Sequence, residues 1–222
     1  MPIGTGAAGL RVTRTMSPVA LLYRAEVTPG KLDLLNAWLP TRPWYTGPAE
    51  PALEKVSAFR FDDPDGAVGV ETLLVRAADG GPVWQAPLTY RDAPLEGAEP
   101  WLLGTCEHTV LGTRWVYDAV GDPVYVTALA TAVLLGGTEA REEVLVDGEL
   151  RPRPPAMSVR GTGVDGATAP ARPSTVSVTE GDPTLIDAGA FGLAVARVLG
   201  SSTLTGPALV AGEQVLAVVR HI

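Results

Sequence analysis

Cys106, Glu107 and His108 bring a thiol, a carboxylate and an imidazole together at consecutive positions of the chain. On a strand, Cys106 and His108 would point to one face and Glu107 to the other. A zinc site needs at least a third protein ligand, and the second histidine, His221, is far away in the sequence. The pattern therefore predicts no metal site, and a partly buried His108 that hydrogen-bonds to its surroundings is the expected arrangement.

The functional alternative for His108 is a cluster of polar side chains that binds a ligand. The candidate residues for that cluster are His108, Arg114, Asp118 and Arg91. An enzyme built around Glu107, His108 and Asp118 is a further alternative, which would require a hydrogen-bonded constellation in a pocket. Two histidines in the whole chain leave few members for a histidine-based acid–base pair.

Two other motifs match known patterns in their letters but not in their context. Residues 4–9 read G-x-G-x-x-G, yet no strand precedes them and Pro18 interrupts the helix that should follow. Residues 62–66 resemble a calcium loop, but the flanking positions lack the oxygen ligands of an EF-hand, so we expect a hairpin turn. The sequence also lacks a G-x-S-x-G, a G-K-[ST] and an H-E-x-x-H motif. No cofactor is predicted.

The composition of the chain excludes several classes of protein. Its 17 basic and 25 acidic residues give a net charge of −8, whereas nucleic-acid-binding surfaces are normally basic. A single cysteine, Cys106, permits no intramolecular disulfide and favours a reducing cytoplasm. Arg24 interrupts the apolar run near the N-terminus before it reaches the length of a membrane span. We therefore expect a cytoplasmic protein that binds neither nucleic acid nor a membrane.

The candidate residues must be positioned by a series of short antiparallel strands. Alternating apolar residues and Asp-Gly turns indicate a meander of hairpins, with strands predicted over residues 56–61, 70–77, 83–90, 101–109 and 113–117. A first helix is predicted from Thr28-Pro29 and a second from Asp122-Pro123, because a capping side chain precedes proline in both.

The composition changes after the second predicted helix, which Gly136-Gly137 should end. A short strand over residues 144–150, broken by Asp147-Gly148, precedes a stiff proline-rich segment. Further strands are predicted over residues 174–179, 191–199 and 214–222. We divide the chain into a flexible end, residues 1–18, a first domain, residues 19–137, a linker, residues 138–156, and a β-rich C-terminal region, residues 157–222.

Three segments carry a recognisable pattern in a fixed order. Residues 38–47 read W-L-P-T-R-P-W-Y-T-G, residues 83–88 read V-W-Q-A-P-L, and residues 115–123 read W-V-Y-D-A-V-G-D-P. They resemble the W-L-P-x-x-R-W-F-x-G, Y-Q-x-P-L and V-Y-D-A-x-x-D-P motifs in the N-terminal cap of the actinobacterial maltokinases and the related aminosugar (glucosamine) kinases. Here Pro43 separates Arg42 from Trp44, and the likeness extends over about residues 19–137.

This resemblance implies an α+β fold in which a curved antiparallel sheet wraps a helix, as in cystatins. In the fused kinases the cap precedes a small ATP-binding lobe, which residues 174–179 and 191–199 weakly resemble. Where that lobe carries the phosphate-contacting lysine of a G-L-x-L-K strand, residues 192–196 read G-L-A-V-A. The catalytic H-G-D and metal-binding D-F-E or D-F-G motifs are also missing, so we expect this chain not to be an enzyme.

The resemblance therefore implies a non-catalytic accessory or regulatory protein that acts by protein–protein interaction. Its expected partner is a separately encoded sugar kinase, with self-association as an alternative. Trp44, Tyr45 and Arg42 are the candidate interface residues, since tryptophan and tyrosine dominate interface hot spots. A second alternative is a sugar or sugar-phosphate binding protein that uses the concave face of the sheet, with Trp84 or Trp101 as the stacking surface.

Overall fold

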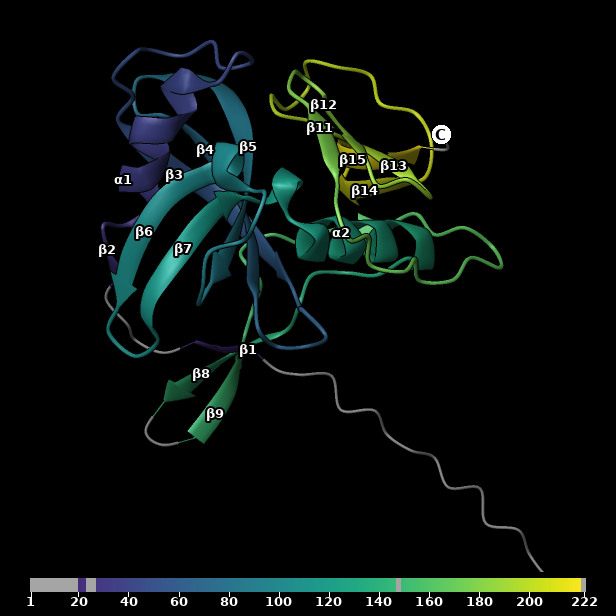
Figure 1. Ribbon diagram of the computed structural model, residues 1–222, viewed down its shortest axis with the longest axis horizontal. Helices are drawn as coiled ribbons and strands as arrows, with labels where there is room; N and C mark the ends of the chain where they lie inside the picture. Colours follow the sequence, from purple (N-terminus) through teal and green to yellow (C-terminus); the bar gives the residue numbers. More distant parts are fainter. Residues whose placement is uncertain (1–19, 23–26, 147–148, 221–222) are drawn as a thin grey trace, which may run out of the picture.

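The computed structural model describes residues 20–22, 27–146 and 149–220, and its two largest elements are six-stranded antiparallel sheets (Figure 1). The first sheet is strongly curled and has the strand order β2-β6-β7-β5-β4-β3. Its strands are β2 (Val27–Thr28), β3 (Leu53–Phe61), β4 (Gly69–Ala77), β5 (Gly80–Arg91), β6 (Leu102–His108) and β7 (Gly112–Asp118).

Helix α1 (Lys31–Trp38) packs on one face of the first sheet. Its start is fixed by Gly30, whose backbone N–H donates to the Asp33 carboxylate at 2.9 Å. Leu35 and Trp38 are buried in a core that they share with Trp84 and other apolar residues of the sheet. The short 3₁₀ helix η1 (Leu39–Thr41) follows directly, and its Leu39 is buried in the same core.

Helix α2 (Pro123–Leu135) packs against both large sheets. Its start is capped by Asp122, whose carboxylate accepts a hydrogen bond from the Val124 N–H at 2.9 Å. Gly136 ends the helix with a φ of 68°, which glycine adopts without steric cost. Both ends are therefore confirmed as the sequence predicts them, and Leu129 packs in one core with residues from each sheet.

The second sheet has the strand order β10-β14-β15-β13-β12-β11 and lies over α2 in Figure 1. Gly161 in this sheet approaches the helix so closely that a Cβ atom there would lie 1.8 Å from the Ala132 carbonyl oxygen. The strands are β10 (Arg160–Gly161), β11 (Ser177–Thr179), β12 (Thr184–Asp187), β13 (Gly192–Val195), β14 (Ala208–Ala211) and β15 (Gln214–Arg220).

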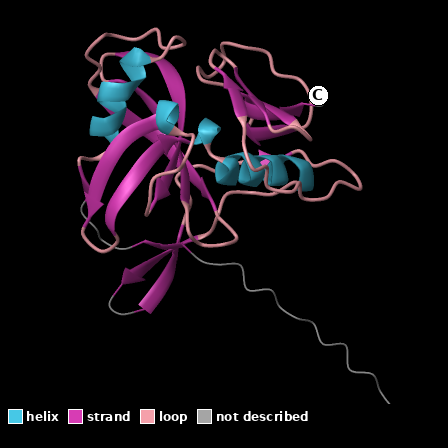
Figure 2. Ribbon diagram, viewed as in Figure 1, coloured by secondary structure: helices cyan, strands magenta, loops and turns pink. Residues whose placement is uncertain are grey.

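A small third sheet, β1-β8-β9, lies apart from these layers. Strand β1 (Ala20–Leu22) runs parallel to β8 (Glu142–Val146), which pairs antiparallel with β9 (Glu149–Arg153). Figure 2 shows the β8–β9 hairpin projecting from the body of the molecule. Two further 3₁₀ turns, η2 (Glu99–Trp101) and η3 (Ala119–Gly121), lie at the ends of β6 and β7.

The observed fold is β-rich with few helices, in agreement with the predicted α+β class. The predicted cap of the first helix is wrong, because Thr28 still belongs to β2, where it pairs with Glu107, and Gly30 is the cap instead. Strands β10, β12 and β14 were not predicted. The prediction of a flexible end over residues 1–18 concerns residues outside those that the structure describes.

Candidate functional site

The first sheet contacts the second through the free edge of β5. The Gln85 N–H donates to the Arg197 carbonyl at 2.8 Å, and the Leu199 N–H donates to the Val83 carbonyl at 2.9 Å. These bonds surround an antiparallel bridge between Trp84 and Val198. The segment that follows β13 therefore extends the first sheet by one short pairing, and it covers an edge that would otherwise expose unpaired backbone groups.

The Gln85 side chain reinforces this contact. Its Nε2 donates to the carbonyl oxygens of Ala196 at 3.0 Å and Leu216 at 3.1 Å, so that one buried amide binds two strands of the second sheet. The side chain is 1% exposed, and replacement by an apolar residue would leave two buried carbonyls without this donor. Gln85 thus connects the two sheets rather than facing a ligand.

Arg197 is the centre of this contact. Its guanidinium donates two parallel hydrogen bonds to the Asp118 carboxylate, at 3.1 and 2.6 Å, and its Nε donates to Thr184 Oγ1 at 2.7 Å. The guanidinium carbon also lies 4.7 Å from the centroid of the Trp44 ring. The side chains of Arg197 and Asp118 are 0% and 2% exposed, so their geometry and pairing compensate the loss of water.

We call this set of contacts the joint, defined by Trp44, Gln85 and Asp118 on the side of the first sheet and by Thr184, Arg197 and Val198 on the side of the second. Tyr125 of α2 lies close to it. Burial raises the pKa of the Tyr125 hydroxyl, while the Arg197 charge opposes that shift. The phenol therefore remains protonated at neutral pH.

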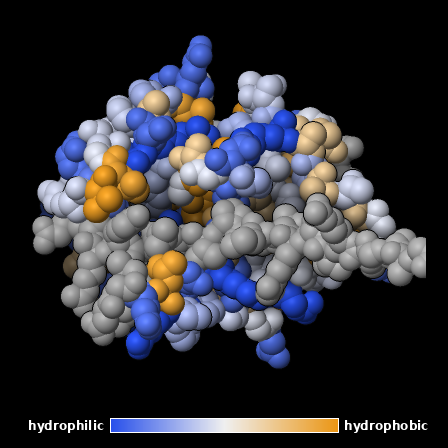
Figure 3. Space-filling view, turned by 90° about the horizontal axis from the view of Figure 1, so that it is seen from below, coloured by the Kyte–Doolittle hydropathy of each residue, from blue (hydrophilic) through white to orange (hydrophobic). Residues whose placement is uncertain are grey.

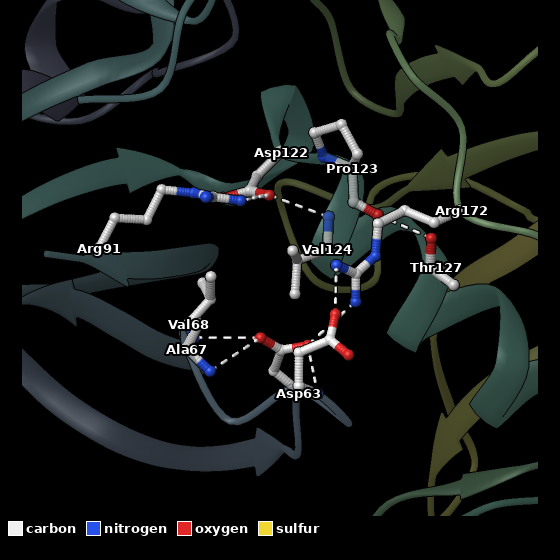
Figure 4. Close-up of polar contacts among 10 residues, drawn as sticks. Asp63, Ala67, Val68, Arg91, Asp122, Pro123, Val124, Thr127 and Arg172 are labelled. Atoms are coloured by element: carbon white, nitrogen blue, oxygen red, sulfur yellow. Dashed lines mark hydrogen bonds and ion pairs between the residues drawn. The ribbon is translucent and has the colours of Figure 1, made fainter. Parts of the chain in front are cut away.

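Asp122 is the centre of a second charged contact next to the joint (Figure 4). Its two carboxylate oxygens accept hydrogen bonds from Nε and Nη2 of Arg91, both at 2.7 Å, while one of them also caps α2. The hydrogen bonds to Asp122 raise the pKa of the Arg91 guanidinium, against the opposing effect of burial. Asp122 itself is 0% exposed, so Arg91 has a structural partner.

The turn between β3 and β4 makes a third charged contact (Figure 4). Asp63, at 4% exposure, accepts hydrogen bonds from three backbone N–H groups of its own turn, those of Asp65, Ala67 and Val68. It also accepts one from Arg172, at 3.0 Å, and Arg172 bonds to Asp65 as well. The predicted hairpin turn is confirmed, and it holds a loop of the C-terminal region.

The three candidate interface residues all lie beside the joint. Trp44 is 5% exposed beneath the Arg197 guanidinium, and Tyr45 packs on Trp84 with ring centroids 4.7 Å apart. Arg42 lies over the Trp38 ring and forms an ion pair with Glu180 of the C-terminal region, at 3.5 Å. The contacts of these three residues are thus made within the chain.

The four residues of the candidate polar cluster have separate environments. His108 Nδ1 accepts hydrogen bonds from the backbone N–H groups of Val110 and Leu111, at 3.2 and 3.1 Å, which confirms a histidine bonded to its own surroundings. Arg91 binds Asp122, and Asp118 binds Arg197, as described above. The remaining residue, Arg114, has a buried Nε without a hydrogen-bond partner.

The sequence prediction did not include Arg197. The signal that could have found it is a single arginine within the otherwise apolar run of residues 191–199, because a charge on a buried strand requires a partner. Its partner Asp118 is 79 positions away, so local patterns could not identify the pair.

The described residues contain no group of three or more His, Cys, Asp or Glu side chains that could hold a metal ion. A shallow hollow of about 380 Å³ lies beside β11 and is lined by Pro173, Ser174, Thr175, Ser177, Asp187, Ala188 and Gly189. Among the helices of the described residues, none has the length and apolar character to cross a bilayer.

The joint residues on the side of the first sheet lie in a segment that matches a known protein family. Residues 38–122 match the family model of the maltokinase N-terminal cap domain. This finding confirms the resemblance seen in the sequence, and it includes Trp44, Gln85, Asp118 and Asp122. No curated protein matches the chain. Helix α2 and the second sheet, with Arg197, lie outside the matched segment.

Proposed function

We propose that this chain is a non-catalytic accessory protein, a cap domain fixed to its own C-terminal sheet, which acts by protein–protein interaction with a separately encoded sugar kinase. The observation that carries the proposal is the joint. The cap residues Asp118 and Gln85 are buried against the second sheet and are unavailable to a substrate. Their contacts support a scaffold, and the proposal places that scaffold in the cytoplasm, in sugar or aminosugar metabolism.

The turn between β6 and β7 offers a site for the partner. Val110 and Leu111 are 53% and 51% exposed, and they are adjacent in sequence. The imidazole of His108 accepts hydrogen bonds from both of their backbone N–H groups, so the turn is ordered before a partner arrives. An ordered apolar tip loses little conformational freedom on binding, which favours its use as an anchor.

The face shown in Figure 3 supports a small anchored contact rather than a broad apolar one. On the face that Figure 3 shows, hydrophobic side chains form separate groups set among hydrophilic ones. Leu135 and Val164, at 49% and 43% exposure, are further exposed apolar side chains in the described residues. Scattered apolar residues are normal on a surface, whereas two neighbours on one fixed turn form a candidate hot spot.

The alternative of a sugar stacked on Trp84 gains no support from these residues. The Trp84 ring is 0% exposed and packs against Tyr45. Arg91, a proposed polar contact, is engaged by Asp122. A sugar would have to displace both contacts in order to bind there.

The experiment is affinity capture from the native host with the tagged full-length chain, compared with its V110D/L111D double variant. We expect the wild type to retain a protein that phosphorylates a saccharide with ATP. The double variant should capture at least tenfold less of that kinase. The V164D variant, which adds a carboxylate at another exposed apolar position, is the matched control and should retain the kinase. Capture that is equal for both variants would contradict the proposed site. ATP-dependent phosphorylation of a saccharide by the purified chain alone would contradict the proposed function.

A further inference from the structure

Three cations, Lys31, Arg60 and Arg114, lie on the face of the first sheet that carries α1. Arg114 is the cross-strand neighbour of Cys106, which belongs to the core beneath α1, so both side chains point to that face. Arg60 is likewise paired with Glu71, which binds Lys31 at the start of the helix. We call Lys31, Arg60 and Arg114 the basic patch.

Contacts around Tyr90 bring two of these cations together. The Lys31 ammonium lies 5.3 Å from the centroid of the Tyr90 ring. A Cβ atom built on Gly69 would lie 3.4 Å from the same ring and 3.7 Å from an Arg60 Nη atom, so the guanidinium reaches across the glycine toward Tyr90.

Arg114 approaches the patch from the opposite side. Burial, the largest effect, and the charge of Glu107, which points to the opposite face of β6, raise the pKa of the Cys106 thiol, while the charges of Lys31 and Arg114 lower it. Both cations therefore lie near this one sulfur atom. Arg60 is in register with Asp118 through β4 and β5, so Arg114 lies three strand spacings, about 14 Å, across the sheet and four residues, about 13 Å, further along it. Arg114 is also two residues from Val116, which pairs with Tyr90, so it lies on the strand next to that ring. The curl of the sheet and two long side chains shorten the gap between the guanidinium groups.

The arginines of the patch differ from those of the joint in their partners. The Arg114 Nε is buried and donates to no acceptor, and among the described residues neither Arg60 nor Arg114 has an ion pair or a side-chain hydrogen bond. Lys31 is held by Glu71, which also accepts a hydrogen bond from the Tyr90 hydroxyl at 3.1 Å. The donors of the two guanidinium groups are therefore available to an anion.

The balance of charge also favours an anion. The carboxylates that face the patch are Glu71, already bound to Lys31, and Asp62, whose carboxyl lies near Arg60. The cations remain in excess over these two groups, although the chain as a whole carries a net charge of −8. A positive patch on an acidic protein raises the local concentration of anions.

We propose that the basic patch binds the phosphate group of a phosphorylated small molecule. The forked guanidinium groups of Arg60 and Arg114 match the oxygen atoms of a phosphate, and the Lys31 ammonium adds a point charge between them. The side chains of Lys31, Arg60 and Arg114 are all partly exposed, so a ligand can reach them from solvent. This site is separate from the Val110–Leu111 tip and does not depend on a kinase partner.

The test is a titration of the full chain with inorganic phosphate, glucose 6-phosphate and ATP, with unphosphorylated glucose as the uncharged control, followed by the amide NMR signals of Gly69 and Cys106. We expect glucose 6-phosphate to bind at millimolar concentration or below, and glucose not to bind. Variants R114Q and R60Q should each weaken binding about tenfold. R76Q, which removes an exposed arginine of the same sheet that pairs with Glu54, should leave binding unchanged.

Each outcome of the titration has a defined meaning. Tighter binding of ATP than of glucose 6-phosphate supports the site and identifies a nucleotide as the source of the phosphate. Equal binding of inorganic phosphate supports the site and shows that the sugar adds nothing. Absence of binding by all three probes overturns the proposal, as does a loss in R76Q equal to that in R114Q. A circular dichroism spectrum that matches the wild type shows that each variant is folded.

Discussion

The joint and the basic patch both place arginines against the first sheet, but they differ in what the arginines contact. In and beside the joint, Arg197, Arg91 and Arg172 each bind a carboxylate that is 4% exposed or less. In the basic patch, neither Arg60 nor Arg114 has a carboxylate partner among the described residues. Pairing with a buried carboxylate indicates an architectural role, and the lack of such pairing indicates a surface available for a ligand.

The burial of the carboxylates gives the comparison its physical basis. A buried ion pair is retained because removing one partner leaves the other charge buried without compensation, even where the pair itself adds little net stability. A partly exposed guanidinium has no such constraint, since water solvates it until a ligand replaces the water. Replacement of arginines in the two regions should therefore give effects of different size and kind.

The largest effect is expected for R197M. This change leaves the Asp118 carboxylate buried without a partner, and we expect a loss of about 3–5 kcal/mol in the free energy of unfolding. Urea denaturation followed by circular dichroism provides the measurement. The double variant D118L/R197M removes both charges and should recover a substantial part of that loss. A loss below about 1 kcal/mol for R197M would show that the ion pair is not structural.

A smaller effect is expected for D122A. The change removes the cap of α2 and the partner of Arg91, and we expect a loss of about 2 kcal/mol from these two contacts. Thermal or urea unfolding measures it. D65A is the matched control, because Asp65 is 69% exposed in its ion pair with Arg172 and should contribute less than about 0.5 kcal/mol. Equal losses for the two variants would contradict this assignment.

Glu71 makes the stability depend on pH. Burial raises the pKa of its carboxyl, but the charges of Lys31 and Arg60 and the hydrogen bonds from Lys31 and Tyr90 together lower it below 4.5. A lowered folded-state pKa stabilises the protein above pH 4.5, and that stabilisation is lost as pH falls through the folded-state pKa. At neutral pH we therefore expect E71Q to be less stable than the wild type, by about 1–2 kcal/mol.

Unfolding curves of E71Q and the wild type at several pH values measure this effect. The difference between the two should be present at neutral pH and should shrink as the pH falls below 4.5, the ordinary pKa of a glutamate. E54Q, which changes a carboxylate that is 46% exposed, is the control and should remain close to the wild type throughout. A difference between E71Q and the wild type that is independent of pH would contradict the role of the charge.

The smallest effect on stability is expected for R114Q. Its guanidinium has no carboxylate partner in the described residues, so we expect a change within about 0.5 kcal/mol in the free energy of unfolding. The same variant should lose about tenfold in phosphate affinity. A large loss of stability in R114Q would remove the contrast with R197M and would place Arg114 among the structural arginines.

Local signals predicted the elements whose ends are set by neighbouring residues. Helix α2 was predicted because Asp122, Pro123 and Gly136 supply both ends within the segment itself. The hairpin turn at Asp63 was predicted for the same reason, since three of its hydrogen bonds close on its own backbone. The long strands β4 and β5 carry enough alternation to be recognised.

The remaining features depend on contacts between distant parts of the sequence. Strand β12 has four residues, too few to show a period, and it forms because β13 pairs with it. The partner of Asp118 is 79 positions away, so the sequence could present Asp118 as a candidate ligand contact but could not identify Arg197. The basic patch likewise requires the pairing of the strands that carry Arg60, Tyr90 and Arg114.

The joint makes the two large sheets a single folding unit, and the distribution of tryptophan allows a direct test of this claim. All five tryptophans lie between residues 38 and 115, so their fluorescence reports on the first sheet, whereas circular dichroism reports on both sheets. In urea, we predict one transition with the same midpoint by both signals, and R197M should shift the two midpoints together. Two separate transitions, or a tryptophan midpoint that R197M leaves unchanged, would contradict the account.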